Sequence, residues 1–262
     1  GSLMVWDVTD RFNVKNIAGN LIDNEYVFKA IHDDVRKFIA FDGTEFHNIH
    51  FVEQVQNQNL HALEPEKFII VSPAEFIDQA VRLGDLHLQY DNLSYLIVTP
   101  QQIYNEFSSG AQDIGAIRDF CRMLYQKSDS TNIPEYLLLF GDGSYDPKCR
   151  NVPNGNWIPT FQSMESLKYG YSFVTEDFFC LYDNNEGNNA YGKTIDIGIG
   201  RFPVNTIEEA RTVVDKIQHY LEKQSSIMGN WKNLVCFIAD DEDNNIHFKQ
   251  AERLQTIIDT GY

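Results

Sequence analysis

The sequence predicts an α/β fold in which helices cover both faces of a mostly parallel sheet, preceded by a small β-rich segment. From about residue 65 onward, short apolar runs of strand length alternate with stretches of helical periodicity. Before that point no segment shows a 3.6-residue period, and Asp, Asn and Gly clusters separate short apolar runs. We therefore expect a β-rich segment over residues 1–64, the edge of a preceding β region, and an α/β region over residues 65–262.

The first region contains short segments rich in β-branched and aromatic residues, the types that favour pleated, half-buried strands. These segments are residues 5–8, 26–30 and 37–41. Because turn-forming clusters such as Asp42-Gly43 bound them, a small antiparallel β module is the simplest arrangement.

In the second region, strands and helices are expected to alternate. The predicted strands are residues 67–71, 93–98, 136–140, 195–199 and 234–239, and the predicted helices are residues 76–84, 113–125, 206–222 and 245–258. Gly84 is expected to end the first helix, while Asp113 and Thr206 are expected to begin the second and third. Such alternation implies right-handed crossovers and a parallel sheet, in which ligands bind beyond the carboxyl ends of the strands.

The chain has 262 residues and a formal net charge of −17. An acidic surface repels phosphate backbones and anionic lipid headgroups, so we expect neither nucleic-acid binding nor binding to a membrane surface. No apolar run approaches the roughly 18–20 residues of a membrane helix, so this segment is not expected to insert into a membrane. Solubility explains the charge most simply, and calcium or a basic partner is the alternative.

Four cysteines are present, and no two have the C-x-x-C spacing of zinc or redox motifs. Cys121 lies in a helical pattern and Cys236 in an apolar run, so both are expected to be small buried apolar residues. Cys149 and Cys180 lie in or near loops, and the sequence leaves open whether they pair.

Carboxylates gather where the predicted strands end. They are Asp142 after residues 136–140, Asp240 and Asp241 after residues 234–239, and Asp177, Asp183 and Glu186 between these points. Single residues of this kind often only cap helices and solvate loops. A second interpretation is a calcium site built from Asp142, Asp177, Asp183 and Glu186, since hard cations prefer crowded oxygen ligands. The third is acid–base or orienting chemistry, which requires a catalytic partner.

The residues do not reveal that partner. A nucleophilic cysteine needs a nearby histidine to accept its proton. None of the seven histidines is flanked by glycines at a tight turn, and no cysteine follows a strand into a small-residue turn. The motifs G-x-S-x-G, H-E-x-x-H and the P-loop are absent. The residues alone therefore indicate a rim of acids without a catalytic pair.

Several segments resemble the gingipain-like cysteine peptidases in their order and spacing. These are residues 136–146 (YLLLFGDGSYD), 197–204 (IGIGRFPV) and 231–241, which ends in Ala-Asp-Asp. Residues 5–10, 57–63 and 103–110 are similar in particular to the sortase-like signal peptidases of the type IX secretion system of Bacteroidetes. The resemblance spans nearly the whole chain.

The resemblance implies a caspase-like α/β fold in two subdomains, with a nucleophilic cysteine and a histidine in a Gly-His-Gly setting. Both catalytic residues are expected after residue 262, so this chain alone is expected to be inactive. Asp241, with Asp240 as its neighbour, matches the acid that orients the histidine. Asn244 and His247 match the side of the specificity pocket, and an asparagine in place of an acid argues against cleavage after basic residues.

The same resemblance implies protein or peptide substrates for the full-length form, other secretion-system components as partners, and a location in the cell envelope, in the periplasm or at the outer-membrane surface. No cofactor is required, and calcium is the candidate ion. A non-catalytic binding module of the same fold, able to hold calcium or a partner, is the main alternative. A nucleotide-binding fold is less favoured because no G-x-G-x-x-G or G-K-[ST] motif is present.

Overall fold

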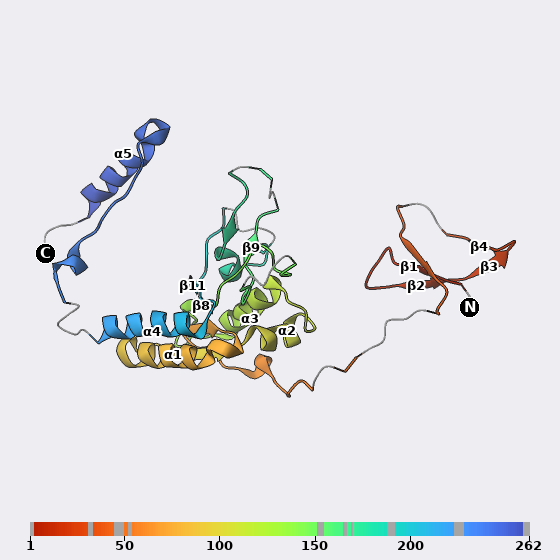
Figure 1. The fold of residues 1–262 in the computed structure, drawn as a ribbon, viewed down its shortest axis with the longest axis horizontal. Coiled ribbons are helices and arrows are strands. Elements are labelled where there is room, and N and C mark those ends of the chain that lie inside the picture. Colours follow the sequence, from red (N-terminus) through yellow and green to blue (C-terminus); the bar gives the residue numbers. More distant parts are fainter. Residues whose placement is uncertain are drawn as a thin grey trace. The chain divides into compact units, whose positions relative to one another are not determined.

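The computed structural model of the chain describes residues 3–30, 34–44, 50–51, 54–150, 155–164, 167–168, 170–187, 192–222 and 228–258. The backbone contacts divide the chain into two compact units, Gly1–Asn57 and Gln58–Tyr262. Figure 1 shows the first as the red strands near the N-terminus.

The first unit is a small antiparallel β module, which confirms the expectation for this region. Its strands are β1 (Met4–Asp7), β2 (Lys15–Ile17), β3 (Gly19–Ile22), β4 (Glu25–Phe28) and β5 (Phe38–Phe41). They form a three-stranded sheet in the order β2-β1-β5 and a β3-β4 hairpin. Asp7 is buried here and pairs with Arg36, whose Nη1 lies 2.9 Å from Oδ2.

The second unit contains a four-stranded parallel sheet in the order β11-β8-β6-β7, as expected. Its strands are β6 (Phe68–Val71), β7 (Tyr95–Val98), β8 (Tyr136–Phe140) and β11 (Gly198–Phe202). The register aligns their first residues, Phe68 with Tyr95 and Tyr136, and Tyr136 with Gly198. All four strands therefore end at one rim of the sheet.

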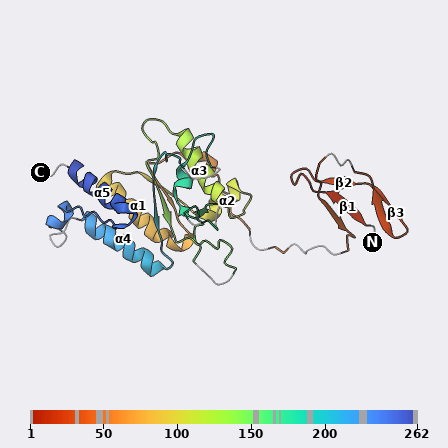
Figure 2. The same ribbon diagram turned by 90° about the horizontal axis from the view of Figure 1, so that it is seen from above.

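Helices cover both faces of this sheet. On one face lie α1 (Ile77–Asp91) and α4 (Ile207–Leu221), which run side by side in Figures 1 and 2, and on the other lie α2 (Pro100–Phe107) and α3 (Ile114–Lys127). Short elements connect them: η1 (Leu60–Ala62), η2 (Ala74–Phe76), β9 (Phe161–Gln162), β10 (Val174–Thr175) and η3 (Asp177–Cys180). η5 (Asn230–Asn233) and α5 (Glu242–Ile257) follow. Within the described residues, no helix is both long and apolar enough to cross a membrane.

Local sequence signals explain where the helices begin. Asp113 accepts a hydrogen bond from the Gly115 N–H, and Thr206 forms a capping box with Glu209, so both predicted helix starts are confirmed. α2 was not expected from the sequence. It begins with Pro100 directly after Thr99, which forms a second capping box with Gln102.

The predicted end of the first helix at Gly84 is wrong. α1 continues to Asp91 and ends where Asn92 adopts the left-handed conformation, with φ 55°. Gly84 instead allows α1 to pack against β7, because a Cβ at this position would lie 2.6 Å from ring atoms of Tyr95. A packing requirement, not a helix stop, therefore explains this glycine.

The strand predicted over residues 195–199 is displaced to Gly198–Phe202. Pairing with β8 begins only at Gly198, opposite Tyr136. Asp196 is held before the strand, where its side chain accepts a hydrogen bond from the Tyr182 N–H and its own N–H donates to the Cys180 carbonyl.

Residues 234–239 do not form a strand, which corrects the prediction, and Cys236 is exposed instead of buried. The handedness of crossovers explains why the run cannot extend the sheet beyond β11. The connection from β6 through α1 leads toward β7, and α4 covers the same face. A connection from β11 through α4 to a new strand outside β11 would cross the sheet in the direction opposite to the β6–α1–β7 connection. It would therefore be left-handed, whereas about 98% of such connections are right-handed.

Candidate active-site region

The best-defined polar cluster at the carboxyl rim of the sheet centres on Arg201 of β11. Its guanidinium forms a two-point ion pair with Glu176, with Nε–Oε1 and Nη2–Oε2 distances of 2.6 and 2.9 Å. Nη1 also donates to the carbonyls of Gly141 and Ile158, each at 2.8 Å. The Arg201 side chain is only 9% exposed. Arg201 thus ties the segment after β8 to the residue that precedes η3.

Sequence reasoning used Arg201 only as part of a family-like segment and did not assign it a role. A signal was available, because an arginine within the otherwise uncharged segment 197–204 must find an acid and several acceptors if its guanidinium is buried. The partner could not be named from sequence, since Glu176 lies 25 residues earlier in a loop.

Asp142, the first acid after β8, has both carboxylate oxygens occupied. One accepts the Gly143 N–H at 2.9 Å and the other accepts Asn205 Nδ2 at 2.8 Å. Its backbone carbonyl accepts the N–H groups of Trp157 and Ile158. Asp142 therefore joins the ends of β8 and β11, and these contacts match the loop-forming interpretation of the acids.

The other acids of the predicted calcium site lie in two local segments, η3 and the turn 183–186. Asp177 is the first residue of η3, and its N–H donates to Thr175. Asp183 and Glu186 close one turn on each other, with the Asp183 N–H donating to a Glu186 carboxylate oxygen at 3.2 Å.

Basic side chains from α3 reach the same turn. Arg118 Nε donates to the Leu181 carbonyl and Arg122 Nη2 donates to Asn184 Oδ1, each at 2.6 Å. Among the residues that the structure describes, no three His, Cys, Asp or Glu side chains are grouped to hold a metal ion. Calcium binding stays a prediction.

Asp240 and Asp241 are exposed and follow the irregular segment 234–239. Asp241 precedes α5 and makes no side-chain capping hydrogen bond. Asp243, Asn244 and Asn245 then adopt the left-handed conformation, with φ of 52°, 58° and 61°. Asp and Asn are the non-glycine residues that tolerate this conformation best.

The same turn brings together the residues predicted to line the specificity pocket. His247 Nε2 lies 3.7 Å from Asp243 Oδ2, and the Asn244 carbonyl accepts a hydrogen bond from Lys249 Nζ at 3.3 Å. Asn244 and His247 therefore lie within one turn at the start of α5, close to Asp241 in sequence. Their roles, and those of Asp240 and Asp241, stay predictions.

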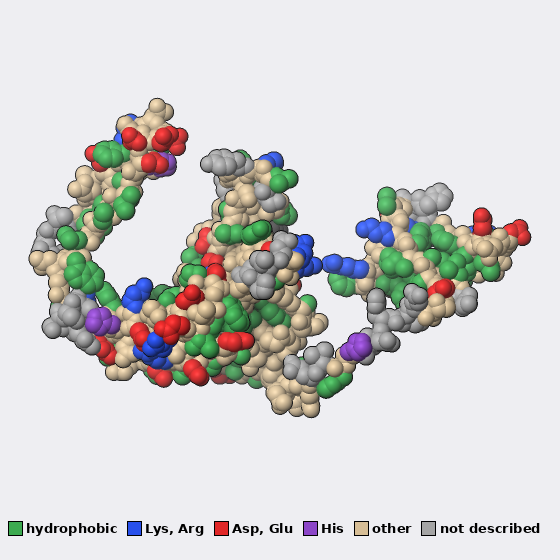
Figure 3. All heavy atoms as spheres, in the orientation of Figure 1, with side chains coloured by type: hydrophobic (Ala, Val, Ile, Leu, Met, Phe, Trp, Pro, Cys, Tyr) green, Lys and Arg blue, Asp and Glu red, His purple; other side chains and the backbone are tan. Residues whose placement is uncertain are grey.

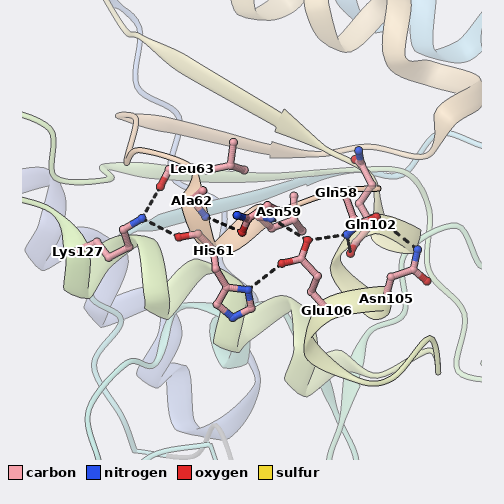
Figure 4. A network of polar contacts seen from close by, with 10 residues as sticks. Gln58, Asn59, His61, Ala62, Leu63, Gln102, Asn105, Glu106 and Lys127 are labelled. Carbon is pink, nitrogen blue, oxygen red and sulfur yellow. Dashed lines mark hydrogen bonds and ion pairs between the residues drawn. The ribbon is translucent and has the colours of Figure 1, made fainter. Parts of the chain in front are cut away.

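A second polar network, shown in Figure 4, attaches residues 58–63 to α2 and α3. The Glu106 carboxylate accepts hydrogen bonds from the Leu60 N–H, Gln58 Nε2 and His61 Nδ1, at 2.7, 2.8 and 2.7 Å. Lys127 Nζ donates to the carbonyls of His61 and Leu63. The second compact unit accordingly begins at Gln58.

These contacts determine the ionisation of Glu106. Burial alone would raise the pKa of this carboxyl, but the donors from Leu60, Gln58 and His61 outweigh burial and lower the pKa to about 2. The His61 ring also stacks on Phe107, with centroids 4.7 Å apart. Both partner segments had been noted as family-like, but their mutual contact could not be inferred from the sequence.

Two buried thiols belong to α3 and η3. Cys121 is buried, as predicted, and Cys180 is a free buried thiol whose Sγ accepts a hydrogen bond from the Tyr182 hydroxyl at 3.8 Å. Burial raises the pKa of Cys180 to about 12 and the pKa of Cys121 well above its usual range. Neither cysteine is therefore a thiolate at neutral pH, as a nucleophile would need to be.

A comparison with known protein families identifies the family of this chain. The model of peptidase family C25 matches residues 61–261, which is most of the chain and nearly all of the α/β unit. The chain belongs to peptidase family C25. This family is the gingipain-like group of cysteine peptidases, as the resemblance of residues 136–146 and 197–204 implied.

Among solved structures, the C25 chain is similar to dimeric latent PorU from Porphyromonas gingivalis. The two are 28% identical, the TM-score is 0.70, and the match covers 97% of this chain and 25% of the PorU chain. The chain thus spans about a quarter of that relative's length.

A complex of RgpB pro- and mature domains from Porphyromonas gingivalis also matches 59% of this chain and 29% of its own, at 21% identity and a TM-score of 0.39. No curated protein sequence matches significantly.

Proposed function

We propose that this chain forms the first part of the catalytic region of a type IX secretion signal peptidase, a cysteine endopeptidase of the cell envelope. The observation that carries the proposal is the C25 match over residues 61–261, together with the similarity to PorU along 97% of the chain. The nucleophilic cysteine and the Gly-His-Gly histidine are assigned to sequence after residue 262, so residues 1–262 alone do not hydrolyse peptides.

In this proposal the cysteine thiolate attacks the scissile carbonyl after the histidine has accepted the thiol proton. Backbone N–H groups stabilise the oxyanion, and the histidine then protonates the leaving amine. Asp241 accepts a hydrogen bond from that histidine and orients it, while Asn244 and His247 line the pocket for the residue before the cleaved bond. Because Asn244 carries no charge, the pocket does not select a basic side chain.

The first experiment compares residues 1–262 with a longer protein that carries the native sequence beyond residue 262. Both are assayed with fluorescence-quenched peptides that place either arginine or an uncharged residue before the cleaved bond. We expect cleavage only by the longer protein, with the uncharged residues preferred and with loss of activity when its candidate nucleophile is changed to alanine.

Asp241→Asn in the longer protein tests the orienting acid. We expect kcat to fall by about 10²-fold or more with KM little changed, because an amide can hold the histidine in the wrong tautomer. Asp240→Asn serves as the control and is expected to retain most activity. Equal activity of the Asp241→Asn and unaltered proteins would exclude the role.

A longer protein that folds, lacks hydrolysis and lacks a Gly-His-Gly motif would instead identify a non-catalytic binding module. Isothermal titration with calcium then examines the second half of that alternative. Heat of binding that is lost in Asp183→Asn would support an ion site at the turn near α3. An absence of heat with the unaltered protein would exclude calcium binding.

A further inference from the structure

Strand β11 contains two glycines, Gly198 and Gly200, on a face that α1 and α4 cover elsewhere. Side chains alternate along a strand, so both glycines share this face with Phe202, which packs against Phe140 at a centroid distance of 5.3 Å. Glycine weakens a strand, and inside one it often marks close approach by a ligand or another backbone.

The fold itself does not require glycine at position 200. A Cβ there would meet no heavy atom within 4 Å, and Gly200 does not have a positive φ. At Gly198, by contrast, a Cβ would lie 3.0 Å from the Tyr136 ring. Gly200 therefore leaves open space above the sheet that a β-branched residue would fill.

This space belongs to a groove of about 730 Å³. Phe68, Leu83, Leu138 and Phe202 line it with apolar surface, and no residue of α4 is among its walls. His87 and Asp91, paired at 2.7 Å, lie along it on α1, and Glu135 lies along it just before β8.

The outer edge of β11 runs beside the groove. Gly198 donates its N–H to the Glu135 carbonyl at 2.9 Å, on the β8 side. In a parallel ladder alternate residues bond to the same neighbour, so Ile199 and Arg201 turn their backbone N–H and C=O groups away from β8. Within the described residues, no strand pairs with this edge. An open edge of this kind is a template for another strand.

We propose that this β11 groove, the outer edge of β11 with the cavity over Gly198 and Gly200, binds an extended basic segment of a partner protein by strand addition. The backbone of that segment pairs with Ile199 and Arg201, and one aliphatic side chain enters the cavity above Gly200.

Charge indicates the chemistry of the partner. Asp91 and Glu135 border the groove, where Asp91 pairs with His87 and Glu135 pairs with Lys67, each at 2.7 Å. The chain as a whole carries −17. A basic segment is therefore attracted, and a second copy of this acidic chain is repelled. The site goes beyond the proposed peptidase function, because no bond is cut here and Asp241 is not involved.

The probe is a fluorescent, end-blocked peptide, Lys-Val-Lys-Leu-Lys-Val-Lys, titrated with the 262-residue chain at physiological salt and followed by anisotropy. A control peptide replaces both valines with proline, which keeps the charge but removes backbone donors. We expect binding of the first peptide only. On binding, amide exchange should slow by about tenfold or more at Ile199 and Arg201.

Gly200→Val fills the floor of the cavity and is expected to weaken binding by about tenfold or more. Gly200→Ala should have an intermediate effect, and it replaces the valine variant in the test if that variant folds poorly. Thr212→Val, which exchanges a hydroxyl for a methyl group on the exposed side of α4, should bind as the unaltered chain does.

Three results would overturn the proposal. They are equal binding of the proline peptide, binding without protection of Ile199 and Arg201, and self-association that protects these amides without any peptide.

Discussion

At the scale of single residues, the chain places its strongest polar interactions where distant segments must be joined. Arg201 joins the segment after β8 to Glu176, and Glu106 joins residues 58–63 to α2. Each side chain is mostly buried and satisfies several partners at once. Loss of one such group leaves others buried and unpaired, which costs more than the original contact contributes.

Arg201→Met is expected to destabilise the protein by about 3 kcal/mol, because Glu176 and the carbonyls of Gly141 and Ile158 would lose their donor. The matched control is Arg211→Met. Arg211 also pairs with a glutamate, Glu208, but is 53% exposed, so its loss should cost at most about 1 kcal/mol. Urea unfolding of the two variants measures the difference, and equal losses would contradict the buried role of Arg201.

Glu106 makes stability depend on pH. Its pKa is about 2 in the folded protein against 4.5 for an ordinary glutamate, so the ionised group stabilises the fold above pH 4.5. That contribution is lost as the pH falls from 4.5 toward 2. Glu106→Gln should therefore lower stability by about 2 kcal/mol at pH 7, and the gap to the unaltered protein should narrow through this range. Melting temperatures measured from pH 7 to 3 give the gap.

Glu135→Gln provides the control for that series. Glu135 pairs with Lys67 through side chains that are both more than a third exposed, so its removal should change the melting temperature little at any pH. A constant difference between Glu106→Gln and the unaltered protein across the acid range would refute the assignment.

At the scale of elements, the sequence predicts those whose own residues carry the signal. β8 is predicted with its exact bounds because its five residues are apolar, and α3 and α4 because their capping residues precede amphipathic patterns. The errors arise where a distant contact decides. Gly84 lies inside α1 because its missing Cβ lets the helix pack against Tyr95, and β11 begins at Gly198 because its pairing with β8 begins there, opposite Tyr136. The run 234–239 has strand composition, but among the described residues it has no pairing partner on this sheet.

Gly84→Ala tests the packing explanation. Alanine normally stabilises a helix by about 1 kcal/mol over glycine, yet here its Cβ would lie 2.6 Å from the Tyr95 ring. We expect a net loss of about 1–3 kcal/mol from overpacking. Gly200→Ala, which meets no atom within 4 Å, should be neutral or stabilising. Thermal unfolding compares the pair, and a stabilised Gly84→Ala protein would show that α1 and β7 do not pack as described.

At the scale of the molecule, the sequence predicts the α/β class and the parallel sheet, because alternating periodicity and crossover handedness leave few arrangements. The site was less predictable. Acids near strand ends were found, but Arg201 with Glu176 and Glu106 with His61 were not paired, since contacts across 25 and 45 residues leave no local pattern.

The two compact units are expected to unfold independently. In the part of the chain that the structure describes, the apolar clusters of the second unit consist of residues between 60 and 221, and the first unit has its own sheet. A chain of residues 58–262 should therefore show the same main calorimetric transition as the 262-residue chain, within a few degrees. A shift of more than about 10 °C would show that the first unit contributes to the stability of the second.

The burial of Cys121 and Cys180 has a practical consequence for labelling. Alkylating reagents attack thiolates, so two thiols with raised pKa values inside the core should resist maleimide in the native protein. Cys236 and Cys149 are exposed. With Cys149 replaced by serine, a dye would attach at Cys236 alone, beside α5. The chain thus contains a native attachment point for fluorescence energy transfer. The distance between a donor and this dye would report any movement of the segment that holds Asp241 when a peptide substrate is added.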